Sequence, residues 1–71
     1  MIIKLTTIQD VQDFVRITNT IPGKVLAGQD EYTVDAKSIM GIFSLDLLKP
    51  ICVYKSPIEH YFEELKQFEV K

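Results

Sequence analysis

The residues that could take part in chemistry are few and lie far apart in the sequence. The only histidine, His60, is followed by Glu63 and Glu64, which are its neighbours if this segment is a helix. A phosphate on the imidazole needs cationic groups or hydrogen-bond donors around it, and two carboxylates provide neither. We therefore interpret His60 as an exposed surface residue without a catalytic role.

No other arrangement of reactive side chains stands out. The only cysteine, Cys52, falls in the middle of an expected strand, where a small apolar side chain typically packs into the core. The sequence contains no Cys-x-x-Cys pair, no histidine cluster with metal-ligand spacing and no glycine-rich phosphate loop. We predict that the chain is not an enzyme and has no catalytic residue, metal ligand or cofactor.

Apolar periodicity in the first half of the chain predicts a strand, a helix and a hairpin. An apolar run over 2–5 ends before Thr7, whose hydroxyl suits the N-cap of a helix with Asp10 as its capping partner. Asn19 ends this helix, and strands at 24–27 and 31–35 follow, joined by a turn at 28–30. Spacings of three and four define the apolar face of the helix: Ile8, Val11, Phe14, Val15 and Thr18.

The second half predicts two helices around one strand. Ser38 suits the N-cap of a short helix over 38–44, and Pro50 interrupts the pattern before a strand at 51–55. Ser56 and Glu59 form a capping box, with Pro57 at the first helical position. This last helix carries a continuous apolar stripe: Ile58, Tyr61, Phe62, Leu65 and Phe68.

Together these elements predict a single α+β domain over residues 1–71. Four short strands and three helices suit a four-stranded antiparallel sheet with the three helices on one face and a wetter opposite face. We expect Ile58, Phe62 and Leu65 to pack over the sheet beside Val11 and Val15.

Composition excludes several classes of protein. Hydrophobic residues make up 46% and charged residues 25%, a balance typical of a globular domain and not of a disordered chain. The net charge of -2 gives no basic excess for a nucleic-acid partner. No apolar run is long enough to span a membrane, and the first residues do not resemble a signal peptide. With one unpaired cysteine, we expect a cytoplasmic protein.

The stretch from Tyr32 to Leu45 resembles HPr, the small phosphocarrier protein of the bacterial sugar phosphotransferase system. The resemblance lies in the run Lys37-Ser38-Ile39-Met40-Gly41, followed by Ser44-Leu45. It implies the HPr-like open-faced β-sandwich. The element order of that fold, β-α-β-β-α-β-α, is the order that the periodicity predicts independently.

The family's carrier site has no counterpart in this sequence. HPr proteins carry phosphate on a histidine at the start of the first helix, in a Gly-Ile-His-Ala-Arg-Pro-like run where an arginine and backbone N–H groups stabilise it. Here the chain passes from Leu5 to Val11 without histidine, arginine or proline. Asp10 in this stretch would also repel a phosphoryl group. We therefore expect no carrier-histidine phosphotransfer.

Ser38 is the position that the resemblance marks as regulatory. In HPr proteins of many bacteria the serine of this motif is phosphorylated by a dedicated kinase, and the phosphorylated form binds a transcriptional regulator of carbon use. Ser38 aligns with that serine, and a phosphate at a helix N-terminus is stabilised by free amides. A serine that only caps the helix leaves the same pattern, so both interpretations stay open.

The apolar residues after Ser38 form the expected partner-binding surface. In the HPr family, parts of this short helix belong to a docking face for proteins. Five apolar residues in seven exceed what one short amphipathic helix must bury, although a small core could use most of them. The candidates are Ile39, Met40, Ile42 and Phe43.

We therefore expect an HPr-like binding or regulatory module that lacks carrier-histidine phosphotransfer. Its partners would be proteins: enzymes of the phosphotransferase system, a serine kinase or a transcriptional regulator. Two alternatives remain. One is a phosphocarrier of sugar transport that uses a non-standard site, and the other is an orphan structural or interaction domain.

Overall fold

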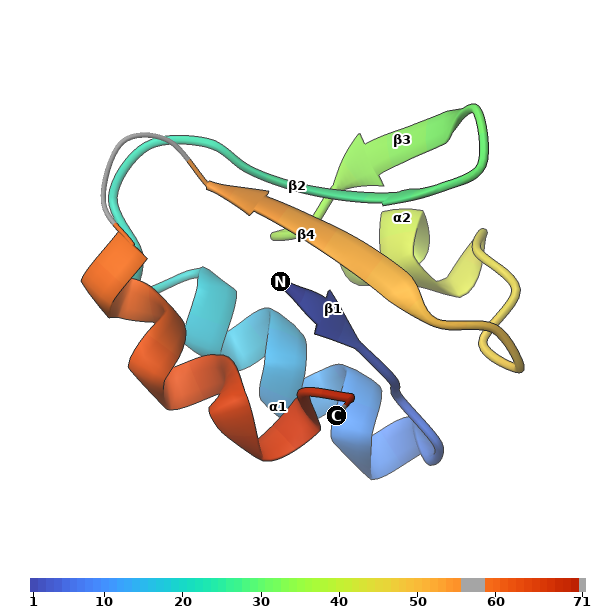
Figure 1. The fold of residues 1–71 in the computed structure, drawn as a ribbon, viewed down its shortest axis with the longest axis horizontal. Coiled ribbons are helices and arrows are strands. Elements are labelled where there is room, and N and C mark those ends of the chain that lie inside the picture. The colour runs from blue at the N-terminus through green and yellow to red at the C-terminus, as the bar shows by residue number, and fades with distance from the viewer. Residues whose placement is uncertain (56–58, 71) are drawn as a thin grey trace.

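The computed structural model describes the backbone of residues 1–55 and 59–70 and the side chains of residues 1–54 and 63–70. The elements of this part are β1 (Ile2–Ile3), α1 (Ile8–Thr18), β2 (Val25–Gln29), β3 (Tyr32–Asp35), α2 (Ile39–Phe43), β4 (Ile51–Lys55) and the 3-10 helix η1 (Glu59–Phe68). Figure 1 shows α1 and η1 side by side below the sheet, with α2 next to β3.

The sheet has four antiparallel strands in the order β1-β4-β2-β3. β4 lies in the interior of the sheet, where Cys52 pairs with Ile2 of β1 on one side and with Gly28 of β2 on the other. β3 forms a hairpin with β2 through pairs such as Ala27 with Val34. The predicted α+β class and the predicted four-stranded antiparallel sheet are thus confirmed.

The two faces of the sheet differ in burial because successive side chains of a strand alternate. Ile51 and Val53 of β4 are buried in the core, whereas Cys52 and Tyr54 lie on the opposite face. On that face Cys52 is half-buried and Tyr54 is exposed. The prediction of a core role for Cys52 is wrong, because the register of β4 gives the core side to its two neighbours.

β2 continues two residues beyond its predicted end. The chain reverses after the strand at Asp30, whose φ of 50° lies in the left-handed region that aspartate tolerates better than most residues. Gly28 lies inside the strand and not in the turn. A Cβ there would lie 3.2 Å from the Tyr32 carbonyl oxygen and 3.4 Å from the Tyr54 ring. Close approach of these neighbours therefore favours glycine at this position.

α1 begins and ends as predicted. Thr7 is its N-cap and Asn19 its C-cap. The apolar face differs at two positions: Ile8, expected inside, is 67% exposed, and Ile17, which the pattern omitted, is buried. Ile8 is the first helical residue, and the buried side chains begin one turn later at Val11.

The last helix is a 3-10 helix over Glu59–Phe68. A 3-10 helix repeats every three residues, so Leu65 and Phe68 fall on one side, and both are buried. The other predictions for this segment lie outside the described part: the cap at 56–57 and the side chains of Ile58, His60, Tyr61 and Phe62.

One hydrophobic cluster joins the sheet to all three helices. Phe14 of α1 and Phe68 of η1 meet edge to face, with ring centroids 6.0 Å apart and an interplanar angle of 80°. Ile42 of α2 belongs to the same cluster and is fully buried. The predicted contact between the first and last helices is present. Within the described residues, no helix is long and apolar enough to cross a bilayer.

Candidate functional site

Ser38 lies at the start of α2 and caps it. Its backbone is extended, with φ -103° and ψ 119°, and its Oγ accepts a hydrogen bond from the Gly41 N–H at 3.1 Å. The side chain is half-buried. The predicted N-cap is thus confirmed, and the hydroxyl lies beside the free amides of the first helical turn.

The turn before Ser38 fixes its direction through local hydrogen bonds. The Asp35 carboxylate accepts from the Lys37 N–H at 2.9 Å, and the Asp35 carbonyl accepts from the Ser38 N–H at 3.1 Å. Aspartate commonly organises a turn by bonding the backbone two residues on. Asp35 therefore orients both residues that precede α2.

The C-terminal end of α1 holds this turn from the other side. The buried Thr18 hydroxyl donates to the Ala36 carbonyl at 2.9 Å, and the Asn19 amide donates to the Lys37 carbonyl at 3.0 Å. The Lys37 ammonium donates to the Ile21 carbonyl just after α1. These contacts join residues 16 to 18 positions apart, and no local spacing in the sequence indicates them.

α2 packs tightly against β3 at Gly41. A Cβ on Gly41 would lie 3.2 Å from the Asp35 carbonyl oxygen and 3.4 Å from the Val34 side chain. Glycine here lets the short helix approach the strand closely. That contact sets which side of α2 faces the core and which side faces outward.

The outward side of α2 is apolar. Met40 is 77% exposed, Phe43 44% and Ile39 38%, and we refer to these three residues as the α2 surface. The sequence left open whether Met40 or Phe43 is exposed, and both are. The prediction that Ile42 binds a partner is wrong, because Ile42 lies on the core side of α2 and is fully buried. Leu45, just beyond α2, is buried as well.

The loop after α2 is ordered by one side chain from β2. The Gln29 amide donates to the Asp46 carbonyl at 2.6 Å and to the Lys49 and Pro50 carbonyls at 3.3 Å, while its oxygen accepts from the Asp46 N–H at 2.8 Å. This loop presents Leu48, which is 85% exposed. The sequence did not indicate Leu48 as a surface residue, because neither its exposure nor the Gln29 hydrogen bonds that order the loop have a local sequence signal.

The Asp10 carboxylate lies at the start of α1, the segment in which the sequence has no histidine. Asp10 Oδ2 accepts from the Thr6 N–H at 3.0 Å and from the Thr6 hydroxyl at 2.9 Å, and the Thr7 hydroxyl accepts from the Asp10 N–H at 3.0 Å. The hydrogen bond from the Thr6 N–H lowers the pKa of Asp10, and the Thr6 hydroxyl lowers it further. Both donors of Thr6 are therefore already used by the Asp10 carboxylate.

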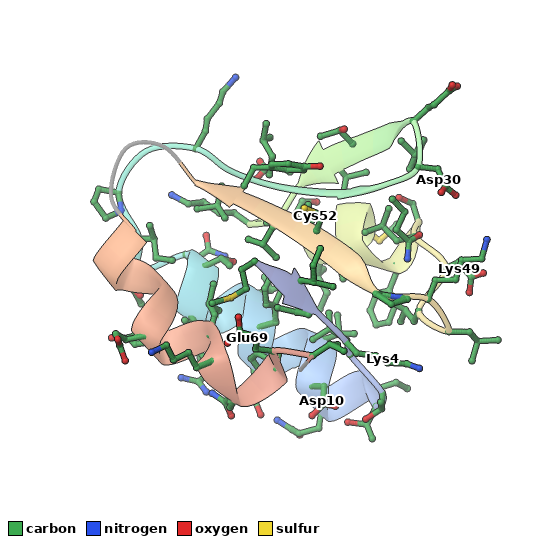
Figure 2. The ribbon with its side chains drawn as sticks, viewed as in Figure 1. Lys4, Asp10, Asp30, Lys49, Cys52 and Glu69 are labelled. Carbon is green, nitrogen blue, oxygen red and sulfur yellow. The ribbon has the colours of Figure 1, made fainter. Side chains whose placement is uncertain are left out.

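Asp10 and Ser38 are not brought together. Thr18 and Asn19 hold the Ser38 turn at the C-terminal end of α1. Asp10 lies in the first turn of α1, and Figure 2 shows it at that end of the helix. An α-helix of 11 residues is about 16 Å long. The two positions therefore lie at opposite ends of α1.

Cys52 and Tyr54 lie on the same, outer face of the sheet. On the outer sheet face, a hydrogen bond with Cys52 raises the pKa of the Tyr54 phenol. Among the described residues, no group of three or more His, Cys, Asp or Glu side chains is placed to hold a metal ion. The candidate site is thus the Ser38 turn with the α2 surface next to it.

Comparisons of the chain with protein-family models, with curated proteins and with solved structures find no match. What the Ser38 turn and the α2 surface do is therefore inferred from their own residues.

Proposed function

We propose that this protein is an HPr-like regulatory module that binds a protein partner through the α2 surface and is phosphorylated at Ser38. It does not transfer phosphate through a carrier histidine. The observation that carries the proposal is the placement of a half-buried capping serine directly before three exposed apolar side chains: Ile39, Met40 and Phe43.

The surroundings of Ser38 support modification there. A phosphoserine carries about -1.5 to -2 charges at neutral pH and gains hydrogen bonds from amides at a helix N-terminus. The Gly41 N–H, already bonded to the Ser38 hydroxyl, is such a donor. The neighbouring Lys37 ammonium donates a hydrogen bond to the Ile21 carbonyl in this structure. Its side chain is flexible, so this cation is close enough in sequence to pair with a phosphate on Ser38.

The α2 surface supports a protein partner. Exposed apolar side chains that adjoin one another mark interaction sites more often than scattered ones do. Met40 and Phe43 lie one turn apart on a helix that Gly41 seats firmly on β3. A charge added at Ser38 would stand at the edge of this surface, so phosphorylation would change what binds to it.

We also propose that the fold is the HPr-like open-faced sandwich with its three helices on one face. Support comes from the element order, which is the order implied by the resemblance, and from the single core cluster to which α1, α2 and η1 all contribute. Ile42, Phe14 and Leu65 represent the three helices in that cluster.

The experiment is treatment with the serine-directed kinase of the HPr family, followed by mass mapping. We expect slow phosphorylation of Ser38, because the kinase also contacts the carrier-histidine loop that this chain lacks, and no phosphate on Ser38→Ala. Normal HPr, treated in parallel, is the positive control. If exhaustive treatment modifies normal HPr but not Ser38, the serine is only a cap and the proposal fails.

A further inference from the structure

We propose that the outer edge of β3 binds an extended, positively charged segment of a partner protein by strand addition. This edge is separate from the α2 surface and from Ser38, so the inference does not depend on the proposed function. It follows from which backbone groups the sheet leaves available and from the charges beside them.

The two edge strands of the sheet, β1 and β3, differ in whether other residues bond to their outer side. The last residue of η1 and the residues after it cover the β1 edge: the Lys4 N–H donates to the Phe68 carbonyl at 2.9 Å, and the Val70 N–H donates to the Ile2 carbonyl at 2.9 Å. In the part of the chain that the structure describes, no strand pairs with the outer side of β3. Figure 1 shows β3 at the margin of the molecule.

The ladder shows which groups of β3 point outward. The Ala36 N–H donates to the Val25 carbonyl at 2.8 Å, so Ala36 faces β2. In an antiparallel pair the direction of the backbone N–H and carbonyl groups alternates along the strand. The backbone groups of Val34 therefore also point to β2, whereas those of Thr33 and Asp35 point away from it.

The available edge is short and has a defined end. The Asp35 carbonyl accepts from the Ser38 N–H at 3.1 Å, which takes it out of any new ladder. What remains is the N–H and carbonyl of Thr33 and the N–H of Asp35. An added antiparallel strand would exchange two hydrogen bonds with Thr33 and accept one from Asp35, the geometry of peptide recognition at a sheet edge.

Charge decides which strand fits. Asp30 and Glu31 lie at the β2–β3 turn, both exposed, and Asp35 is exposed at the far end of β3. Figure 2 shows Asp30 at the tip of the hairpin. Three carboxylates within six residues favour a partner that carries Lys or Arg, and the nearest cation in sequence, Lys37, is bonded to the Ile21 carbonyl.

The same charges argue against a second copy of this chain. Antiparallel pairing of two β3 strands centred on Thr33 would place Asp35 of each copy opposite Glu31 of the other. Like charges directly opposite each other in a sheet are destabilising. The occupant that the edge favours is therefore a basic segment whose alternate residues lie opposite Asp35, Thr33 and Glu31.

The probe is the synthetic peptide Lys-Val-Thr-Val-Lys, capped at both ends, titrated into the isotope-labelled protein and followed by NMR. We expect saturable shifts centred on residues 32–36 and slower hydrogen exchange at the Thr33 and Asp35 amides. A matched peptide with Glu in place of both Lys residues should bind at least about fivefold more weakly, since each cross-strand charge pair changes affinity by about two- to fivefold.

Two variants separate the contribution of the backbone from that of charge. Thr33→Pro removes the outward N–H without removing a bond to β2, and edge strands tolerate proline, so it should abolish binding. Glu31→Gln with Asp35→Asn removes both carboxylates that lie opposite Lys residues of the peptide, keeps hydrogen-bonding side chains of similar shape, and should weaken binding of the Lys peptide about fourfold or more. The double variant tests the proposal even if Thr33→Pro does not fold.

Three results would overturn the inference. The first is no shift at millimolar peptide. The second is a set of shifts on the α2 surface instead of β3. The third is concentration-dependent shifts of β3 without any peptide, which would identify a second copy as the occupant.

Discussion

Thr18→Val tests how the end of α1 positions the Ser38 turn. Thr18 is fully buried, and its hydroxyl oxygen lies 2.9 Å from both the Ala36 and the Val15 carbonyl oxygens. A hydroxyl has one proton, so the two acceptors share it. Valine has the same shape, and the substitution therefore removes the donor while leaving the buried Ala36 carbonyl without it.

The expected cost follows from that geometry. A buried polar group left unsatisfied costs about 1–3 kcal/mol. For a domain of this size each kcal/mol lowers the melting temperature by about 4–8 °C, so Thr18→Val should melt roughly 4–24 °C lower. Thr18→Ser, the matched control, keeps the donor and loses only one methyl group, which is about 1 kcal/mol.

Thermal unfolding and amide hydrogen exchange together measure this effect. We expect Thr18→Val to speed exchange of the Ser38 and Gly41 amides, because the turn that orders them loses its anchor, and Thr18→Ser to leave them unchanged. Wild-type stability and wild-type exchange in Thr18→Val would refute the reasoning, since the hydroxyl would then hold nothing in place.

Three further predictions follow from the same contacts. Ser38→Ala should lower the free energy of unfolding by about 0.5–2 kcal/mol, because the cap is lost. Ser38→Asp also caps a helix and should melt within a few degrees of wild type. If thermal unfolding showed the same loss of stability in both variants, Ser38 would not act as a cap. In urea unfolding, Ile42→Ala should lower the free energy of unfolding by about 2–5 kcal/mol, because Ile42 is buried, and Met40→Ala by about 0.5 kcal/mol or less, because Met40 is exposed. If Met40→Ala were the more destabilising of the two, α2 would have to present its other side to the core. The lowered pKa of Asp10 stabilises the folded state above the usual pKa of an aspartate, and this contribution is lost as the pH falls through the lower folded-state value. Asp10→Asn should therefore show a weaker loss of stability on acidification, and acid titrations that superimpose would count against the hydrogen bonds to Thr6.

The order of the elements could be predicted from the sequence because its signals are local. Thr7, Asn19 and Ser38 were all identified as helix boundaries, since a cap satisfies backbone groups within three residues of itself. The strand at 51–55 was also correct in its bounds, because Pro50 marks its start.

Features that depend on register or on distant contacts could not be predicted in this way. The strand pattern around Cys52 does not show which face of β4 meets the core, and the run from Ile39 to Phe43 does not show which of its residues α2 buries. Ile42 was therefore assigned to the partner-binding surface although it belongs to the core. Neither the hydrogen bond from Thr18 to Ala36 nor those from Gln29 to the loop after α2 could be foreseen, because they join residues 17 to 21 positions apart.

The central claim is regulation at Ser38 without a carrier histidine, and the intact mass of the protein tests it most directly. The protein is incubated in turn with the phosphoenolpyruvate-dependent enzyme that charges HPr and with the serine-directed kinase, and its mass is measured before and after acid treatment. We predict one acid-stable phosphate, from the kinase alone, that is absent in Ser38→Ala. An acid-labile phosphate from the first enzyme, lost in His60→Ala, would contradict the account.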